Sequence, residues 1–121
     1  MLYQSTTRIK SNLFEGVEFT IARMTFGRRI ELMRRVRQLS AQMEFEKAGS
    51  HVADQIHASL IGAEIDALYL KWGLVTIEGL ELDCGEVTAE SLASHGPEDL
   101  CREIVAAIKS ECALTDAERK N

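Results

Sequence analysis

The spacing of hydrophobic and polar residues predicts a short β-structure at the start of the chain. Apolar residues alternate with polar ones at Val17, Phe19 and Ile21, which is the period of a strand with one buried face. Residues 6–11 are placed to pair with this strand. We therefore expect an N-terminal β-hairpin within residues 5–25, and such a hairpin needs helical cover to be stable.

The next segment, residues 28–48, is expected to form a long helix. Its apolar residues recur in steps of four, three and four, as one stripe of an amphipathic helix requires. They are Leu32, Val36, Leu39 and Met43. Gly49 follows at the position where a helix C-cap belongs.

A second long helix is expected over residues 51–72, with Ser50 as its N-cap. This helix has two apolar stripes. The first consists of Ala53, Ile56, Leu60, Ala63, Ala67 and Leu70, and the second of Ile61, Ile65, Leu68 and Trp72. Because apolar residues cover more than half of its circumference, the helix must be buried on two sides, by the first helix, a sheet or another subunit.

Shorter elements complete the predicted fold. Residues 74–82 are expected to form two short strands around Gly79, a central hairpin. Helices are expected at residues 88–95 and 97–113. The resulting fold class is α+β and helix-dominated, in a single domain that spans residues 1–121.

Charge is unevenly distributed along the chain. The 121 residues carry a formal net charge of −5. Residues 1–47 contain nine Lys or Arg and five Asp or Glu, a net charge of +4, whereas residues 48–121 contain five and fourteen, a net charge of −9. An acidic protein repels nucleic-acid phosphates unless its basic residues are segregated. The observed segregation favours contacts with other proteins over phosphate binding.

Five arginines within ten residues are the most prominent polar feature: Arg28, Arg29, Arg34, Arg35 and Arg37. We expect Arg28, Arg34 and Arg35 to face solvent, away from the apolar stripe of their helix. This electrostatic patch has three interpretations: a solvated face partly neutralised by Glu31 and by the acidic half of the chain, pairing with an acidic protein partner or within the chain, or nucleic-acid binding. The last is the least favoured, because no aromatic residues that could stack on bases are interleaved with the arginines.

The sequence contains no recognisable catalytic, cofactor-binding or metal-binding motif. His51, Asp54 and His57 invite a metal interpretation, but the two histidines are six residues apart and lie on different faces of a helix. The glycines form no phosphate-binding loop. We therefore expect a non-enzymatic protein with no cofactor and no metal.

The three cysteines indicate a reducing environment, because an odd number without CxxC spacing does not suit a disulfide framework. Cys84 is expected to be exposed, and Cys101 and Cys112 to be buried. No apolar run approaches the ~18 residues of a membrane span. The N-terminus also lacks a secretory signal pattern. We expect a cytoplasmic protein without membrane contact.

The second predicted helix carries the candidate partner-binding residues. Its excess of apolar surface, with aromatic residues at its end, suits a protein interface. The residues are Leu60, Ile61, Tyr69 and Trp72. Packing within the core is the alternative, and the two interpretations are compatible. A chain this short has limited means to cover both stripes, so we expect a partner, either a second copy or a client protein, to cover part of them.

Three segments carry a resemblance to a known group of proteins. They are residues 28–37 (RRIELMRRVR), residues 64–74 (EIDALYLKWGL), and residues 101–109 (CREIVAAIK) with the end of the chain at 118–121 (ERKN). Together they resemble small proteins from the tail-gene regions of phages and prophages, in particular the tail assembly chaperones of long-tailed phages. The resemblance covers most of the chain and consists of helical patterns.

This resemblance implies a small, mainly helical, non-enzymatic protein that binds hydrophobic segments of the tape measure protein and keeps them soluble while tail tube subunits polymerise around it. For a phage-encoded chain, this takes place in the bacterial host cytoplasm. Two alternatives stay open. One is a structural tail or head-tail component retained in the virion, and the other is a small nucleic-acid-associated regulator that uses the arginine-rich helix.

Overall fold

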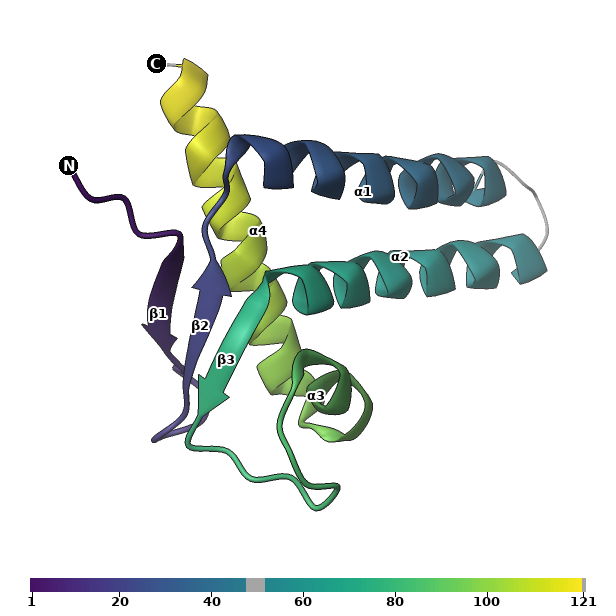
Figure 1. Cartoon of the computed structure of the whole chain (residues 1–121). Helices are drawn as coiled ribbons and strands as arrows, with labels where there is room; N and C mark the ends of the chain where they lie inside the picture. The colour runs from purple at the N-terminus through teal and green to yellow at the C-terminus, as the bar shows by residue number, and fades with distance from the viewer. Residues whose placement is uncertain (48–51, 121) are drawn as a thin grey trace. The chain divides into compact units, whose positions relative to one another are not determined.

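The structure is a computed structural model that describes the chain apart from residues 48–51 and 121, with side chains described except at 43, 46, 47 and 113–120. Its elements, in order, are β1 (Thr6–Lys10), β2 (Glu18–Ala22), α1 (Phe26–Lys47), α2 (Val52–Gly73), β3 (Leu74–Glu78), α3 (Ala89–His95) and α4 (Glu98–Lys120) (Figure 1). The α+β, helix-dominated class is confirmed. The predicted caps Gly49 and Ser50, like His51, lie outside the described residues.

The chain divides into two compact units. The first, which we call the sheet unit, comprises Met1–Thr25 and Tyr69–Asn121. The second, which we call the helical hairpin, comprises Phe26–Leu68. The expectation of one domain over residues 1–121 stays a prediction.

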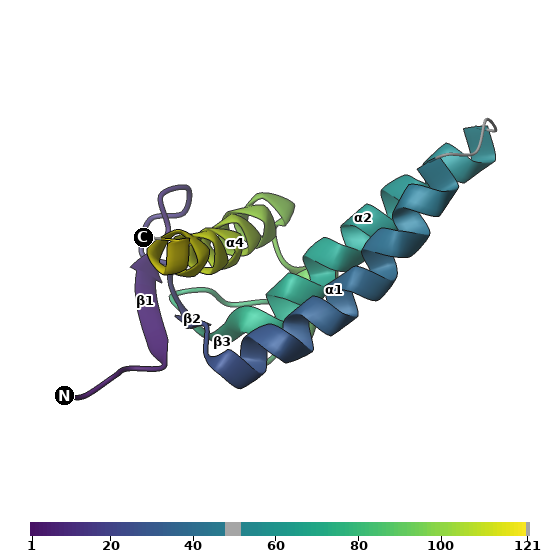
Figure 2. The same cartoon turned by 90° about the horizontal axis from the view of Figure 1, so that it is seen from above.

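The sheet unit is built on three antiparallel strands in the order β1-β2-β3. The predicted N-terminal hairpin is present as β1 and β2, with Ile9 opposite Phe19. Phe19 and Ile21 are each only 1% exposed, as the alternating pattern predicted for the buried face. Helix α4 lies across this face of the sheet (Figures 1 and 2).

The core of the sheet unit combines the central strand with apolar positions from three helices. Residues of α4 at helical spacing supply much of it, because a stripe that recurs every three or four residues faces one side. The buried cluster comprises Val17, Phe19, Ile21, Leu70, Leu92, Leu100, Ile104, Val105 and Ile108. Leu92, Leu100 and Ile104 have no measurable exposure.

The central hairpin expected over residues 74–82 is not formed, and this part of the prediction is wrong. The described residues contain one strand there, β3, and it pairs with β2 so that Ile77 lies opposite Phe19. Gly79 ends the strand with φ +82, and a side chain there would collide with the carbonyl oxygen of Gly16. The backbones of the two turns therefore meet closely, and the chain leaves the sheet instead of folding back on itself.

Helices α3 and α4 occupy the positions predicted for the C-terminal helices. Thr88 caps α3: its hydroxyl accepts from the Ser91 N–H, and the Ser91 hydroxyl accepts from the Thr88 N–H. This reciprocal pair satisfies two backbone donors that the first helical turn would otherwise leave open. Helix α4 follows Pro97 and begins with Glu98 and Asp99, whose charges are favourable at a helix N-terminus.

In the helical hairpin, α1 and α2 run antiparallel, side by side (Figures 1 and 2). Leu32 of α1 is 3% exposed. On α2, Ala58, Ile61 and Ile65 are 1%, 2% and 9% exposed. Of the predicted α1 stripe, Leu32 is buried and Val36 and Leu39 are half-buried, and the Met43 side chain lies outside the described ones. Of the second predicted α2 stripe, Ile61 and Ile65 are buried and Leu68 is half-buried.

Candidate functional site

The other apolar stripe of α2 is exposed along the hairpin. Val52, Ile56 and Leu60 are 70%, 66% and 53% exposed. Ala53 and Ala63, which continue the same helical spacing, are exposed as well. We call these five residues the α2 stripe. We expected α2 to be buried on two sides. Within the hairpin it is buried on one side, and the α2 stripe on the other side is exposed.

Helix α1 has an exposed apolar stripe of its own. Phe26, Ile30 and Met33 are 75%, 41% and 60% exposed, and their spacing of four and three residues places them on one helix face. We call these three residues the α1 stripe. This stripe was not predicted, although its spacing can be read in the sequence, because arginines are interleaved with its apolar residues.

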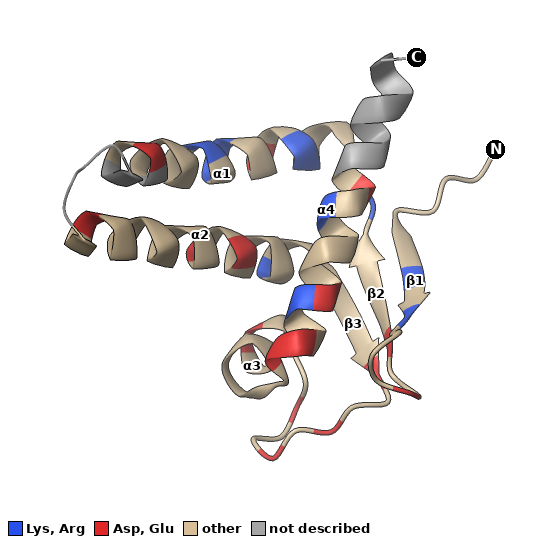
Figure 3. Ribbon diagram, turned by 180° about the vertical axis from the view of Figure 1, so that it is seen from behind, with Lys and Arg blue, Asp and Glu red and all other residues tan. Residues whose placement is uncertain are grey.

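The charges beside the two stripes are opposite in sign. Glu64 and Asp66 are exposed on either side of the line that the α2 stripe follows. Arg34 and Arg37 are exposed beside the α1 stripe and one turn beyond it. By sequence, helix α1 carries six Lys or Arg and three Glu, whereas residues 52–68 carry three Asp or Glu and no Lys or Arg. Basic segments on the described part of α1 and acidic segments on α2 can be followed in Figure 3.

The four predicted partner-binding residues do not form one surface. Leu60 is exposed, but Ile61 is only 2% exposed and belongs to the packed side of α2. Tyr69 and Trp72 are half-buried against the core of the sheet unit. The ammonium of Lys109 lies 5.3 Å from the centre of the Tyr69 ring, a cation–π contact within that unit. The aromatic residues that suggested an interface serve packing here, and only Leu60 stays a candidate contact.

The arginine patch also differs from its prediction. Arg28 was expected to face away from the apolar stripe, but it lies four residues before Leu32, about 40° around the helix, and is half-buried. Arg29 is half-buried too. Arg35 donates to Glu31 across one turn at 2.8 Å, the local neutralisation expected of a solvated face. At about 100° per residue the five arginines are spread around α1, so they present no single basic face.

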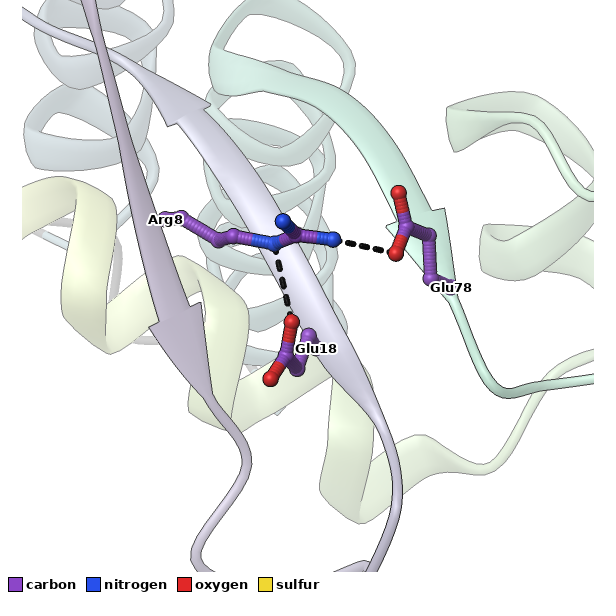
Figure 4. Close-up of polar contacts among 3 residues, drawn as sticks. All are labelled: Arg8, Glu18 and Glu78. Carbon is purple, nitrogen blue, oxygen red and sulfur yellow. Dashed lines mark hydrogen bonds and ion pairs between the residues drawn. The ribbon is translucent and has the colours of Figure 1, made fainter.

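A polar cluster covers the other face of the sheet (Figure 4). The Arg8 Nε contacts a carboxylate oxygen of Glu18 at 2.8 Å, and its Nη2 donates to Glu78. The three residues come from β1, β2 and β3, so one guanidinium spans the whole sheet. Since Arg8 and Glu78 are more than half exposed, this cluster stabilises the pairing of the strands only modestly.

Glu103 of α4 anchors the turn between β1 and β2. Its two carboxylate oxygens accept from the Ser11 hydroxyl at 2.6 Å and from the Asn12 N–H at 2.7 Å. The Ser11 oxygen in turn accepts from the N–H groups of Leu13 and Phe14. This carboxylate is engaged in holding the turn against α4, which gives it a structural role.

Among the described residues, the cysteines and potential metal ligands lie apart from one another or serve packing. Burial, with a smaller effect from the Glu98 charge, raises the pKa of the Cys101 thiol, which donates to the Leu92 carbonyl at 3.5 Å. Cys84 is exposed, as expected, whereas Cys101 and Cys112, which were expected to be buried, are half-buried. Within the part of the chain that the structure describes, no three His, Cys, Asp or Glu side chains are placed to hold a metal ion. His57 is exposed on α2.

Among the described residues, no helix is both long enough and apolar enough to cross a membrane. No known protein-family model matches the chain, and neither a curated protein nor a solved structure shows significant similarity to it. The function is therefore inferred from the surface of the helical hairpin.

Proposed function

We propose that this chain is a non-enzymatic binding protein that covers hydrophobic segments of another protein during assembly, as a tail assembly chaperone does. The observation that carries the proposal is the α2 stripe, whose large side chains are more than half exposed at Val52, Ile56 and Leu60. Isolated apolar side chains on a surface are ordinary, but a continuous stripe along a helix suits a partner that packs along it.

The shape of the surface supports a helical or extended apolar segment as the client. Residues 52–63 span about 16 Å of helix at 1.5 Å per residue. An amphipathic helix that lays its apolar side along this length would contact residues at i, i+4 and i+8 or i+7, the spacing that helix-binding surfaces use. The resemblance of the chain to tail assembly chaperones favours the tape measure protein as this client.

Binding is the function for which the described residues provide a structural argument, through the exposed α2 stripe. The polar clusters of the sheet unit are committed to holding strands and turns together, as at Arg8 and Glu103. The charged residues beside the α2 stripe, Glu64 and Asp66, suit a rim that orients a client bearing basic residues.

Co-expression with a tape measure protein encoded beside this chain tests the proposal. We expect the client to become more soluble and to co-purify with the chain. The double substitution Ile56→Glu and Leu60→Glu should abolish both effects, because it places charge in the centre of the stripe. Leu13→Glu, at a 62% exposed position of the sheet unit, is the matched control and should behave as the wild type.

No co-purification and no gain in client solubility with the wild-type chain would contradict the proposal. Mass spectrometry of finished particles separates the chaperone role from the structural one. An assembly chaperone should be missing from purified virions, whereas a tail or head-tail component should be present in fixed stoichiometry.

A further inference from the structure

We infer that copies of this chain associate with one another by placing the α1 stripe of one copy on the α2 stripe of another. The inference goes beyond the proposed function, because it concerns the chain alone and involves no client. It rests on the exposure, the charge and the order of residues along the two helices of the hairpin.

A single chain cannot bring its own stripes together. Ile56 of the α2 stripe and Ile65 of the packed side are nine residues apart, which is about 180° around the helix. The α2 stripe therefore points away from the side of α2 that the hairpin buries. On α1, the buried Leu32 is two residues from the exposed Ile30 and one from Met33, so the α1 stripe also lies off the packed side.

The two stripes are complementary in charge, which singles out a second copy as the occupant. The α2 stripe is bordered by Glu64 and Asp66, and residues 52–68 contain no Lys or Arg. Its best partner is an apolar stripe bordered by basic residues. The α1 stripe with Arg34 and Arg37 has that composition. Pairing α2 with another α2 would instead bring acidic borders together.

The order of residues decides the direction of pairing. On both helices the charged residues that border the stripe, Arg34 and Arg37 on α1 and Glu64 and Asp66 on α2, follow its apolar residues in the sequence. With Ile30 opposite Ile56 of the second copy and the helices parallel, Arg37 lies about 10.5 Å further along α1 and Glu64 about 12 Å further along α2. An antiparallel pairing would separate the same two charges by more than 20 Å. The contact between copies is thus parallel, whereas α1 and α2 of one chain are antiparallel.

Such an interface is heterologous, because two different surfaces meet. A heterologous contact either closes into a ring or two-fold assembly that uses each surface once, or grows as an open chain. An assembly that has not closed keeps one free α1 stripe at one end and one free α2 stripe at the other, so the average size of the assemblies should rise steadily with concentration. A protein that binds the α2 stripe would compete with it.

Sedimentation velocity and light scattering of the purified full chain test the inference. The wild type should associate with rising concentration. An α1 variant (Ile30→Glu with Met33→Glu) and an α2 variant (Ile56→Glu with Leu60→Glu) should each stay monomeric. An equimolar mixture of the two variants should form a 1:1 complex, because one retains an intact α2 stripe and the other an intact α1 stripe. Leu13→Glu should associate as the wild type does.

Charge reversal gives a second test that leaves the apolar residues in place. Arg37→Glu alone and Glu64→Arg alone should each weaken self-association by about three- to tenfold at low salt. The two substitutions in one chain should restore it, because they exchange the charges of a single pair. High salt should reduce the difference between these variants.

Three results would overturn the inference. The first is a wild type that stays monomeric up to about 1 mM, because a dissociation constant above that value corresponds to less than about 4 kcal/mol of binding free energy. The second is an α1 variant that dimerises while the α2 variant does not, which would mean that α2 pairs with α2. The third is a failure to restore association both in the mixture of the two stripe variants and in the double charge reversal. Because binding of a client plays no part in these measurements, failure here would leave the proposed function standing, and the reverse also holds.

Discussion

At the scale of single residues, neighbours on α2 meet opposite environments. Leu60 is 53% exposed and Ile61 is 2% exposed, although both are aliphatic and adjacent in the sequence. The rotation of about 100° per residue is enough to move a side chain from the packed side of the hairpin to its surface. A substitution at Ile61 therefore tests the stability of the hairpin, whereas one at Leu60 tests its binding.

This contrast predicts different costs for the same substitution. Ile61→Ala should lower the free energy of unfolding by about 2–4 kcal/mol, because it removes buried methyl groups and leaves a cavity. Leu60→Ala should change it by less than about 0.5 kcal/mol, as expected at a surface position. Urea unfolding monitored by circular dichroism, at a concentration where the chain is monomeric, measures both. Equal costs at the two positions would contradict the assignment of buried and exposed sides.

At the scale of elements, the β1–β2 turn and α4 are joined by one carboxylate. Glu103 accepts two hydrogen bonds from residues that are more than 90 positions earlier in the chain, Ser11 and Asn12. Hydrogen bonds to a charged group are the stronger kind, and Ser11 and Glu103 are half-buried. This contact fixes the turn against α4 and thereby helps to hold the sheet on its covering helix.

Glu103→Ala should therefore cost about 2 kcal/mol of unfolding free energy, since it leaves two donors without their acceptor. Arg102→Ala is the matched control on the adjacent residue. It removes the Arg102–Glu98 pair, whose side chains are 74% and 77% exposed, and should cost less than about 0.5 kcal/mol. Chemical unfolding of the two variants gives the comparison. A cost for Glu103→Ala no larger than that of the control would show that the turn does not depend on α4.

At the scale of the whole molecule, the two units differ in how much apolar surface they bury. The sheet unit has a buried cluster that includes Phe19, Leu100, Ile104 and Ile108, all at most 1% exposed. The large side chains buried in the hairpin are fewer among the described residues, with Leu32, Ile61 and Ile65 below 10% exposure. Local opening is easier where fewer apolar contacts are lost.

Amide hydrogen exchange should therefore be slowest in the middle of α4, around residues 100–108, and faster in residues 33–42 and 53–60 of the hairpin. Peptide-level exchange measured by mass spectrometry on dilute, monomeric protein checks this order. Protection of the hairpin should rise at concentrations where copies associate, because the stripes are then covered. Equal protection of α4 and the hairpin in dilute solution would contradict the difference in burial.

The sequence by itself determined the local features of this protein. Period-two alternation located β2, and spacings of three and four located α1, α2 and α4, because both patterns follow from the geometry of a single element. It also showed that α2 has two apolar sides and that charge is segregated along the chain. These properties depend only on residues close together in the sequence.

Only the tertiary structure decided which of these features meet. Residues 74–78 pair with β2 instead of forming a hairpin of their own, since strand pairing depends on partners far away in the sequence. In the structure Ile61 is buried, Leu60 is exposed, and Tyr69 and Trp72 pack against the core of the sheet unit. It also revealed the α1 stripe beside the arginines. An apolar stripe becomes a core or a binding surface according to what packs on it, and a local pattern does not contain that information.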